Sequence, residues 1–280
     1  MIQALIIVLR EVLEAALIVG IVLAASRGVP RRGLWVLAGI GAGIGGSLVV
    51  AGFAEGIAMA LSGVGQEVFN AGVLLLATVM LGWHNVWMKS QGRELAREMQ
   101  NAGSAVSSGL KPLSLLLVVV GIAVLREGSE IVLFLYGIAA GGADALALWT
   151  GSLLGLLAGG ALGGLIYFGL LRIPTRHLFS VTSWMILLLA AGMASQAAGF
   201  LVQAGLIPGI VEPLWDSSGL LPEHHPIGAV LGALMGYDDQ PSAMQLIFFV
   251  VTFAFIALLM RFVDRPPSVH RSSDAVSAAI

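Results

Sequence analysis

Two copies of one charged motif, Arg-Glu-x-x-Glu, lie inside long apolar stretches of the sequence. The copies are Arg10-Glu11-Val12-Leu13-Glu14 and Arg126-Glu127-Gly128-Ser129-Glu130. Helical positions three and four apart share one face, so each motif places its arginine and both carboxylates along one stripe. Each motif has a net charge of −1 when its groups are ionised, because carboxylates outnumber guanidiniums. This surplus is poorly suited to a static lock between helices and well suited to binding a cation.

The free-energy cost of placing these charged side chains in a membrane predicts the direction in which they point. Three ionised residues near the centre of an apolar helix cost about 7–10 kcal/mol. The fourteen Leu, Ile and Val residues of 2–25 return about 4–8 kcal/mol on the same scale. We therefore expect the charged stripe to point into a helix bundle. Arginines that only tie helices together are the structural alternative, but two motifs at the same depth favour a functional site.

The composition indicates a membrane protein. Of 280 residues, 58% are hydrophobic and only 11% charged, and the mean hydropathy is +0.96; soluble domains carry about 25% charged residues. The absence of cysteine excludes disulfides, thiolate ligands and a cysteine nucleophile. No Lys or Arg precedes the first apolar run, so we expect 2–25 to be a retained span rather than a signal peptide. We expect the lipid bilayer, and no nucleic acid, as a partner.

Seven apolar stretches are long enough to cross the bilayer, which takes about 20 helical residues. They are about 2–25, 33–55, 66–88, 113–139, 146–171, 178–204 and 243–262. The sequence therefore predicts an all-α membrane protein with seven transmembrane helices. They would form a single transmembrane domain over 1–265, followed by a short disordered cytoplasmic tail at 266–280.

The basic residues predict the orientation of the chain. Twelve of the fourteen Lys and Arg residues lie after the first, third, fifth and seventh stretches, or at the end of the seventh. By the positive-inside rule this side is cytoplasmic. The N-terminus is then outside and the C-terminus inside, in a plasma (inner) membrane. The two other basic residues are Arg10 and Arg126.

The chain shows signs of an internal duplication, since the second motif follows the first by 116 residues. Two weaker matches pair Gly41, Gly45, Gly46 with Gly159, Gly163, Gly164, and Leu74-Leu75-Leu76-Ala77 with Leu187-Leu188-Leu189-Ala190. Repeat one covers about 2–88, repeat two about 113–204, and 243–262 is an extra helix. Three spans per repeat require the second to be inverted, a 3+3 arrangement with the substrate site near the midplane. Small residues at every fourth position from Gly151 to Gly163 predict close helix packing.

The ligand chemistry narrows the choice of ion without deciding it. We expect the four carboxylates to have no cysteine and no histidine beside them, a set that suits a hard cation and leaves iron, manganese, magnesium, calcium and a proton. Intramembrane proteases need Ser with His or paired Asp, and di-iron oxidases need Glu-x-x-His. Neither pattern accompanies the motifs, so we expect no enzyme. A proton-coupled carrier of another divalent cation or small solute, using the same glutamates, is the alternative function.

Paired Arg-Glu-x-x-Glu motifs in the first and fourth of seven spans resemble the high-affinity iron permease family. That family includes the fungal oxidase-coupled and the bacterial elemental-iron permeases. The resemblance extends to Gln66-Glu67, Trp215-Asp216, Gly236-Tyr237 and Pro241-Ser242. It implies iron, Fe²⁺ or Fe³⁺, as transported substrate and no permanently bound cofactor. It also implies a ferroxidase or periplasmic iron-handling protein as the kind of partner.

The resemblance also assigns roles to the motif residues. It implies that iron in transit binds Glu11, Glu14, Glu127 and Glu130, with Arg10 and Arg126 tuning the site. Glu67, Asp216 and Asp238 are further candidates for an outer access route or a cation-gathering loop, although solvated loops are often acidic without such a role. His84, between Trp83 and Asn85, is typical of an interfacial residue beside aromatic anchors.

Overall fold

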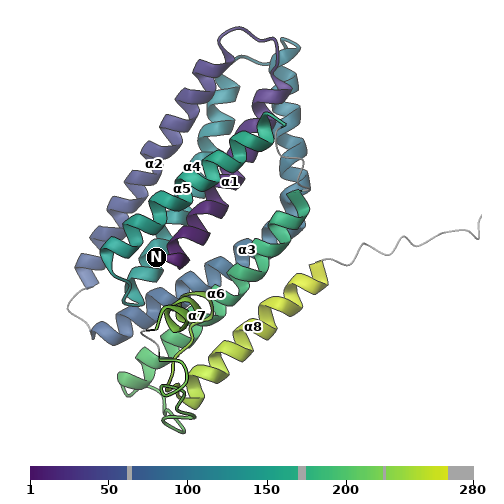
Figure 1. Cartoon of the computed structure of the whole chain (residues 1–280). Helices are drawn as coiled ribbons and strands as arrows, with labels where there is room; N and C mark the ends of the chain where they lie inside the picture. Colours follow the sequence, from purple (N-terminus) through teal and green to yellow (C-terminus); the bar gives the residue numbers. More distant parts are fainter. Residues whose placement is uncertain (62–64, 170–174, 223–224, 264–280) are drawn as a thin grey trace, which may run out of the picture.

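The computed structural model describes residues 1–61, 65–169, 175–222 and 225–263. The predicted tail, 266–280, lies outside these residues. The described helices are α1 (Ile2–Ala25), α2 (Arg32–Leu61), α3 (Gln66–Ser107), α4 (Ser114–Ala140), α5 (Ala145–Tyr167), α6 (Thr175–Gln203), α7 (Pro226–Met235) and α8 (Ala243–Val263) (Figure 1). No described residue belongs to a β-strand, so the predicted all-α class is confirmed.

Five of the described helices are long and apolar enough to cross a membrane. These segments are Arg32–Gly56, Gln66–Gly92, Ala145–Tyr167, Ser180–Gln203 and Ala243–Val263. Helices α1 and α4, with 24 and 27 residues, are also long enough, but each holds three charged residues at its centre. The chain is therefore a multi-pass helical membrane protein, while the count of seven spans stays a prediction.

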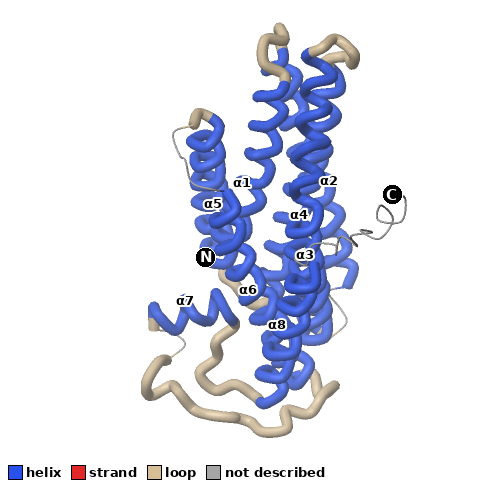
Figure 2. The backbone as a smooth tube through the Cα atoms, turned by 90° about the vertical axis from the view of Figure 1, so that its right-hand side faces the viewer, coloured by secondary structure: helices blue, strands red, loops and turns tan. Residues whose placement is uncertain are grey.

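Helices from the first half of the chain pair with helices from the second half. Helix α1 packs against α5 and α4 packs against α2, and α1 and α4 also contact each other (Figure 1). Helix α3 packs against α6, which in turn packs against α8. Figure 2 shows α7 and the loops around it gathered at one end of the molecule. The two helices that carry the charged motifs thus meet in the middle of the bundle.

Glycines allow these pairs to approach backbone to backbone. A Cβ atom added to Gly155 of α5 would lie 2.6 Å from the carbonyl oxygen of Leu5 in α1, and one on Gly159 would lie 2.7 Å from that of Leu9. In the other pair, a Cβ on Gly43 of α2 would lie 2.8 Å from the carbonyl oxygen of Gly121 in α4. The close packing predicted for the glycines from Gly151 to Gly163 is confirmed.

The packing glycines correct the predicted register between the two halves. Gly39 and Gly43 contact α4, and Gly155 and Gly159 contact α1; the second pair follows the first by 116 residues, the same separation as the two charged motifs. Gly41 and Gly159, which the sequence pattern paired at a separation of 118 residues, therefore do not pack alike. A Cβ on Gly41 or Gly45 would meet nothing within 4 Å. Glycines that face open space look the same in the sequence as packing glycines.

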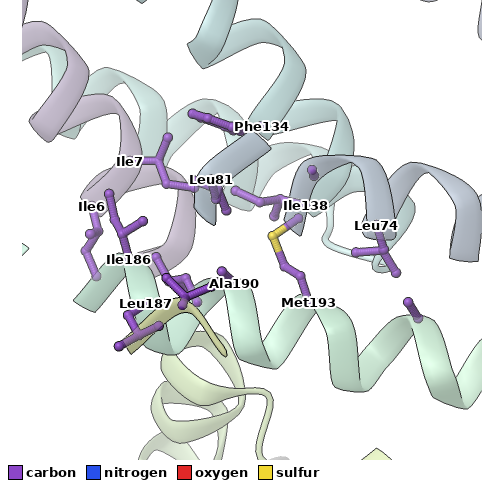
Figure 3. Close-up of a cluster of buried hydrophobic side chains, with 14 of the residues drawn as sticks. Ile6, Ile7, Leu74, Leu81, Phe134, Ile138, Ile186, Leu187, Ala190 and Met193 are labelled. Atoms are coloured by element: carbon purple, nitrogen blue, oxygen red, sulfur yellow. The ribbon is translucent and has the colours of Figure 1, made fainter. Parts of the chain in front are cut away.

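Two separate apolar clusters lie at different levels of the bundle. The first joins α1, α3, α4, α6 and α8, and includes Ile7, Leu81 and Phe134 (Figure 3). The second joins the other ends of α1 and α4 with α2 and α3, and includes Val22 and Leu116. Helix α1 contributes its start to the first cluster and its end to the second, whereas α4 does the reverse. The two motif helices are therefore antiparallel.

Helix α3 continues well beyond the predicted span of 66–88, to Ser107. Its polar second half is amphipathic: Arg97 lies 3.6 Å from Glu94 on the exposed face, while Gly103 approaches Ala25 of α1 and Val106 joins the second apolar cluster. Hydropathy detects the part of a helix that is compatible with lipid, so it missed this polar extension.

The glycine contacts generate a prediction about stability. Replacing Gly155 with Leu should destabilise the protein by about 1–3 kcal/mol, because the new side chain would push α5 off the backbone of α1. Gly160→Leu is the matched control, since Gly160 lies on the same helix and a Cβ there would meet nothing within 4 Å. Thermal unfolding in detergent measures both variants. Equal unfolding temperatures for the two would show that this contact is not tight.

Candidate metal centre

The two charged motifs come together in the interior of the bundle. Arg10 is 1% exposed, Glu11 0% and Glu127 2%, and Glu14 is buried as well. Glu130 and Arg126 are less enclosed, with side chains 16% and 31% exposed. The prediction that the charged stripes point into the bundle is confirmed.

Each arginine forms its shortest contact with the second glutamate of its own motif. Arg10 Nε lies 2.9 Å from Glu14 Oε1, and Arg126 Nε donates a hydrogen bond of 3.1 Å to Glu130 Oε1. The first glutamate of each motif is farther away: Glu11 Oε1 and Glu127 Oε1 are each 3.8 Å from a nitrogen of their arginine. The helical spacing of four residues explains the preference, because i and i+4 are neighbours on a helix surface.

Histidine 84 of α3 joins the two motifs. Its side chain is 4% exposed, and Nε2 lies 3.6 Å from both Glu11 Oε2 and Glu14 Oε2. Its Nδ1 contacts Glu130 Oε2. The prediction that His84 is an interfacial residue was wrong. It is the neighbouring Trp83 that faces outward, 72% exposed.

A periodic signal in the sequence could have located His84. The buried positions of α3 on either side of His84 include Leu74, Ala77, Thr78, Leu81 and Asn85. Their spacing of three and four residues is that of one helix face. His84 continues this face, whereas Trp83 and Trp87 lie beside it. The adjacent aromatic residues suggested a membrane interface, although the periodicity of the helix favoured burial.

Four side chains are close enough to share one metal ion. Glu11, His84, Glu127 and Glu130 each present a ligand atom, and these atoms all lie within 4.8 Å of one another. Ligands that bind one cation at 2.0–2.6 Å lie no more than about 5 Å apart. The set comes from three helices, α1, α3 and α4. Carboxylate oxygens with one imidazole nitrogen form a donor set that suits a divalent transition metal.

Several buried polar atoms of this site have no hydrogen-bond partner among the described residues. Among the residues that the structure describes, none donates a hydrogen bond to either oxygen of Glu11 or Glu127, and Nε2 of His84 lies 3.6 Å from Glu11 and Glu14, beyond hydrogen-bond distance. Leaving a buried polar group unsatisfied costs about 1–3 kcal/mol, and more for a charged group. The two motifs together carry a charge of −2 when ionised. A bound cation would satisfy both the unused oxygens and the surplus charge.

The charged layer lies between the two apolar clusters. Ile7, Leu81 and Phe134 pack on one side of it, each within about one helical turn of a charged site residue. Val22 and Leu116 belong to the cluster on the other side. Apolar side chains on both sides therefore separate the layer from the two ends of the bundle.

A pocket of about 210 Å³ reaches the charged layer at the second motif. It is lined by Met80, Trp83, His84, Trp87, Arg126 and Glu130. The guanidinium of Arg126 lies over the ring of Trp87, 4.0 Å from its centroid. This cation–π contact and the bond to Glu130 hold Arg126 at the mouth of the pocket.

The outer candidates Glu67, Asp216 and Asp238 are not part of the buried cluster. Glu67 is exposed in the first turn of α3. Gln240 links the other two, since its side chain donates to Asp216 Oδ2 at 3.1 Å and its backbone N–H donates to Asp238 Oδ1 at 2.9 Å. Hydrogen bonds from Ser218 also lower the pKa of the Asp216 carboxyl group. Both aspartates stabilise the loop; their predicted role in access stays untested.

Comparison with known proteins identifies the family of the chain. A model of the iron permease FTR1 family matches residues 1–263. The ferrous iron permease EfeU of Escherichia coli O6:H1 (strain CFT073) is 34% identical over 249 residues, covering 85% of this chain and 87% of the relative. The protein of the same name from strain 536 is 33% identical over 281 residues, covering 96% and 98%. No solved structure matches the chain.

The family match covers nearly all of the chain, and these relatives are matched over most of their own length. They are named as permeases, that is, transporters rather than enzymes. The resemblance noted in the sequence is therefore confirmed: the chain belongs to the iron permease FTR1 family.

Proposed function

We propose that this chain carries ferrous iron across the membrane and that Glu11, Glu14, Glu127 and Glu130 bind the ion in transit. The observation that carries the proposal is the meeting of both motifs in one buried layer with more carboxylates than arginines. The names of the relatives, ferrous iron permeases, support Fe²⁺ as the substrate.

The charge of the site also favours a divalent ion. Four glutamates and two arginines sum to −2, so Fe²⁺ would neutralise the layer, whereas Fe³⁺ would leave a buried positive charge. A buried charge without a partner is expensive in a low-dielectric interior. Arg10 and Arg126 tune the site by their pairs with Glu14 and Glu130, so that iron meets a moderate rather than a full negative charge. A moderate charge lets the ion leave as well as bind.

The proposed architecture is a single transmembrane domain over 1–265 with seven spans, α1 and α4 included, built as an inverted 3+3 repeat plus α8. Two observations support the repeat. Helix α1 packs on α5 as α4 packs on α2, and the packing glycines share the 116-residue separation of the motifs. Alternate opening of the two apolar clusters would expose the charged layer first to one side and then to the other; a relay between carboxylates is the other route.

The proposed location is the inner membrane, with the N-terminus outside and the C-terminus in the cytoplasm. The distribution of Lys and Arg supports this orientation. A periplasmic iron-handling protein or a ferroxidase would then meet the chain on the side of the loop that holds Asp216 and Asp238. The transported iron is the substrate, and no resident cofactor is part of the proposal.

Replacing Glu14 or Glu130 with Gln tests the proposed function. Each change should reduce Fe²⁺ uptake by about 10-fold or more, because it removes a charge and a ligand oxygen from the layer. Radioactive iron uptake into proteoliposomes that contain the pure protein is the measurement. Glu94→Gln is the control, since Glu94 lies on the exposed face of α3 with a side chain 59% exposed. Uptake that survives both site changes would remove these glutamates from the mechanism, and proton flux without iron flux would favour the alternative carrier.

The orientation can be tested with single cysteines, because the chain has none of its own. Leu220→Cys, at a position 92% exposed in the loop before α7, should react with a membrane-impermeant maleimide in intact spheroplasts. Ser108→Cys, between α3 and α4, should react only after the membrane is permeabilised. The opposite labelling pattern would place the N-terminus in the cytoplasm.

A further inference from the structure

We infer that His84 is the residue that makes this site select iron over harder divalent cations, by supplying a nitrogen ligand to an otherwise all-carboxylate centre. The inference rests on the proposed function and adds a specificity residue to it. Helix α3 carries neither charged motif, yet it places the buried imidazole of His84 between the two motifs.

The geometry places both ring nitrogens of His84 in the charged layer. Nε2 faces Glu11 and Glu14 of α1 at 3.6 Å, and Nδ1 faces Glu130 of α4. Nδ1 is thus paired with Glu130, whereas Nε2 has no hydrogen-bond partner in the part of the chain that the structure describes. Nε2 is the nitrogen that can bind a cation arriving between the carboxylates.

The supports around His84 hold it in place. The next residue, Asn85, is buried and donates a 2.9 Å hydrogen bond to the carbonyl oxygen of Ser183 in α6. Two turns earlier, Thr78 donates to the carbonyl oxygen of Ala190, also in α6, at 3.3 Å. Leu81, one turn before His84, is fully buried. Helix α3 is thus anchored on α6 on both sides of the histidine, which fixes the position of its backbone in the charged layer.

The histidine adds a nitrogen ligand to oxygen ligands, and the type of ligand atom determines which metal ions a site prefers. Carboxylate oxygens suit Mg²⁺, Ca²⁺ and Mn²⁺ as well as iron, so glutamates alone discriminate weakly among these ions. Imidazole nitrogen suits iron and the later transition metals, and affinity for such sites rises from Mn²⁺ to Fe²⁺. One nitrogen ligand therefore favours Fe²⁺ over the more abundant Mg²⁺. A histidine that only paired with glutamates as a structural cation would give no such preference.

The first test detects the nitrogen directly. Mn²⁺, a paramagnetic probe of the same site, is bound to the full-length wild-type protein in detergent and studied by electron spin echo modulation. Modulation from a directly bound ¹⁴N nucleus is expected. It should vanish in His84→Gln and persist in His225→Gln, a control at an exposed histidine of the outer loop. Wild-type protein that binds Mn²⁺ without nitrogen modulation would overturn the inference, and this result needs no variant to fold.

The second test measures selectivity. Competition of Mg²⁺ and Mn²⁺ against Fe²⁺ uptake is compared in proteoliposomes with wild-type, His84→Gln and His225→Gln protein. The preference for Fe²⁺ should fall by about 10-fold or more in His84→Gln and stay unchanged in the control. His84→Met, with a side chain of similar size, provides a second variant if the first is unstable.

The outcomes separate the two proposals. Loss of Fe²⁺ uptake in the Glu14 and Glu130 variants, with unchanged selectivity in both His84 variants, would refute the role of His84 alone. Fe²⁺ uptake that is intact in the Glu14 and Glu130 variants would refute the proposed binding of iron by these glutamates, and this inference with it.

Discussion

The incomplete neutralisation of four buried glutamates by two arginines is the interaction on which the rest of the structure depends. Each arginine engages the second glutamate of its motif and leaves the first less compensated. A layer of this kind is tolerated in a membrane protein only when protein surrounds it and a cation or proton can balance it. The sequestration of the layer between two apolar clusters follows from the same constraint, because water at this depth would weaken both the pairing and the attraction for an ion.

The scaffold keeps the two motifs together through close backbone contacts. Glycines of α5 fit against α1, and glycines of α2 fit against α4, so neither motif helix can move sideways without breaking a glycine contact. Helices α1 and α4 then meet each other along their motif faces. Small residues therefore position the ligands, although none of them lies in the site. This division explains why a chain with 37 glycines can still hold charged side chains in fixed places.

Much of this arrangement could be predicted from the sequence. The all-α class, five of the seven predicted apolar spans, the inward direction of both motifs and the family are confirmed. Three features were missed for physical reasons. His84 was assigned to the interface because its aromatic neighbours suggested it, although its helix face was buried. The second half of α3 is polar, so a search for apolar stretches does not detect it. The register of the glycines could not be found from composition, because only a neighbouring helix distinguishes a packing glycine from an open one.

The pairing of helices from one half of the chain with helices from the other half limits which parts of the molecule can move as rigid bodies. Since α1 is fixed to α5 and α4 to α2, the two sequence halves are interwoven and cannot separate from each other as units. A second boundary runs between the four-helix group α1, α2, α4 and α5 and the three-helix group α3, α6 and α8, and α3 packs across it against α1 and α4. All four glutamates stand on one side of that boundary, and His84 stands on the other. Any separation of the two groups would thus move the imidazole of His84 away from the four glutamates.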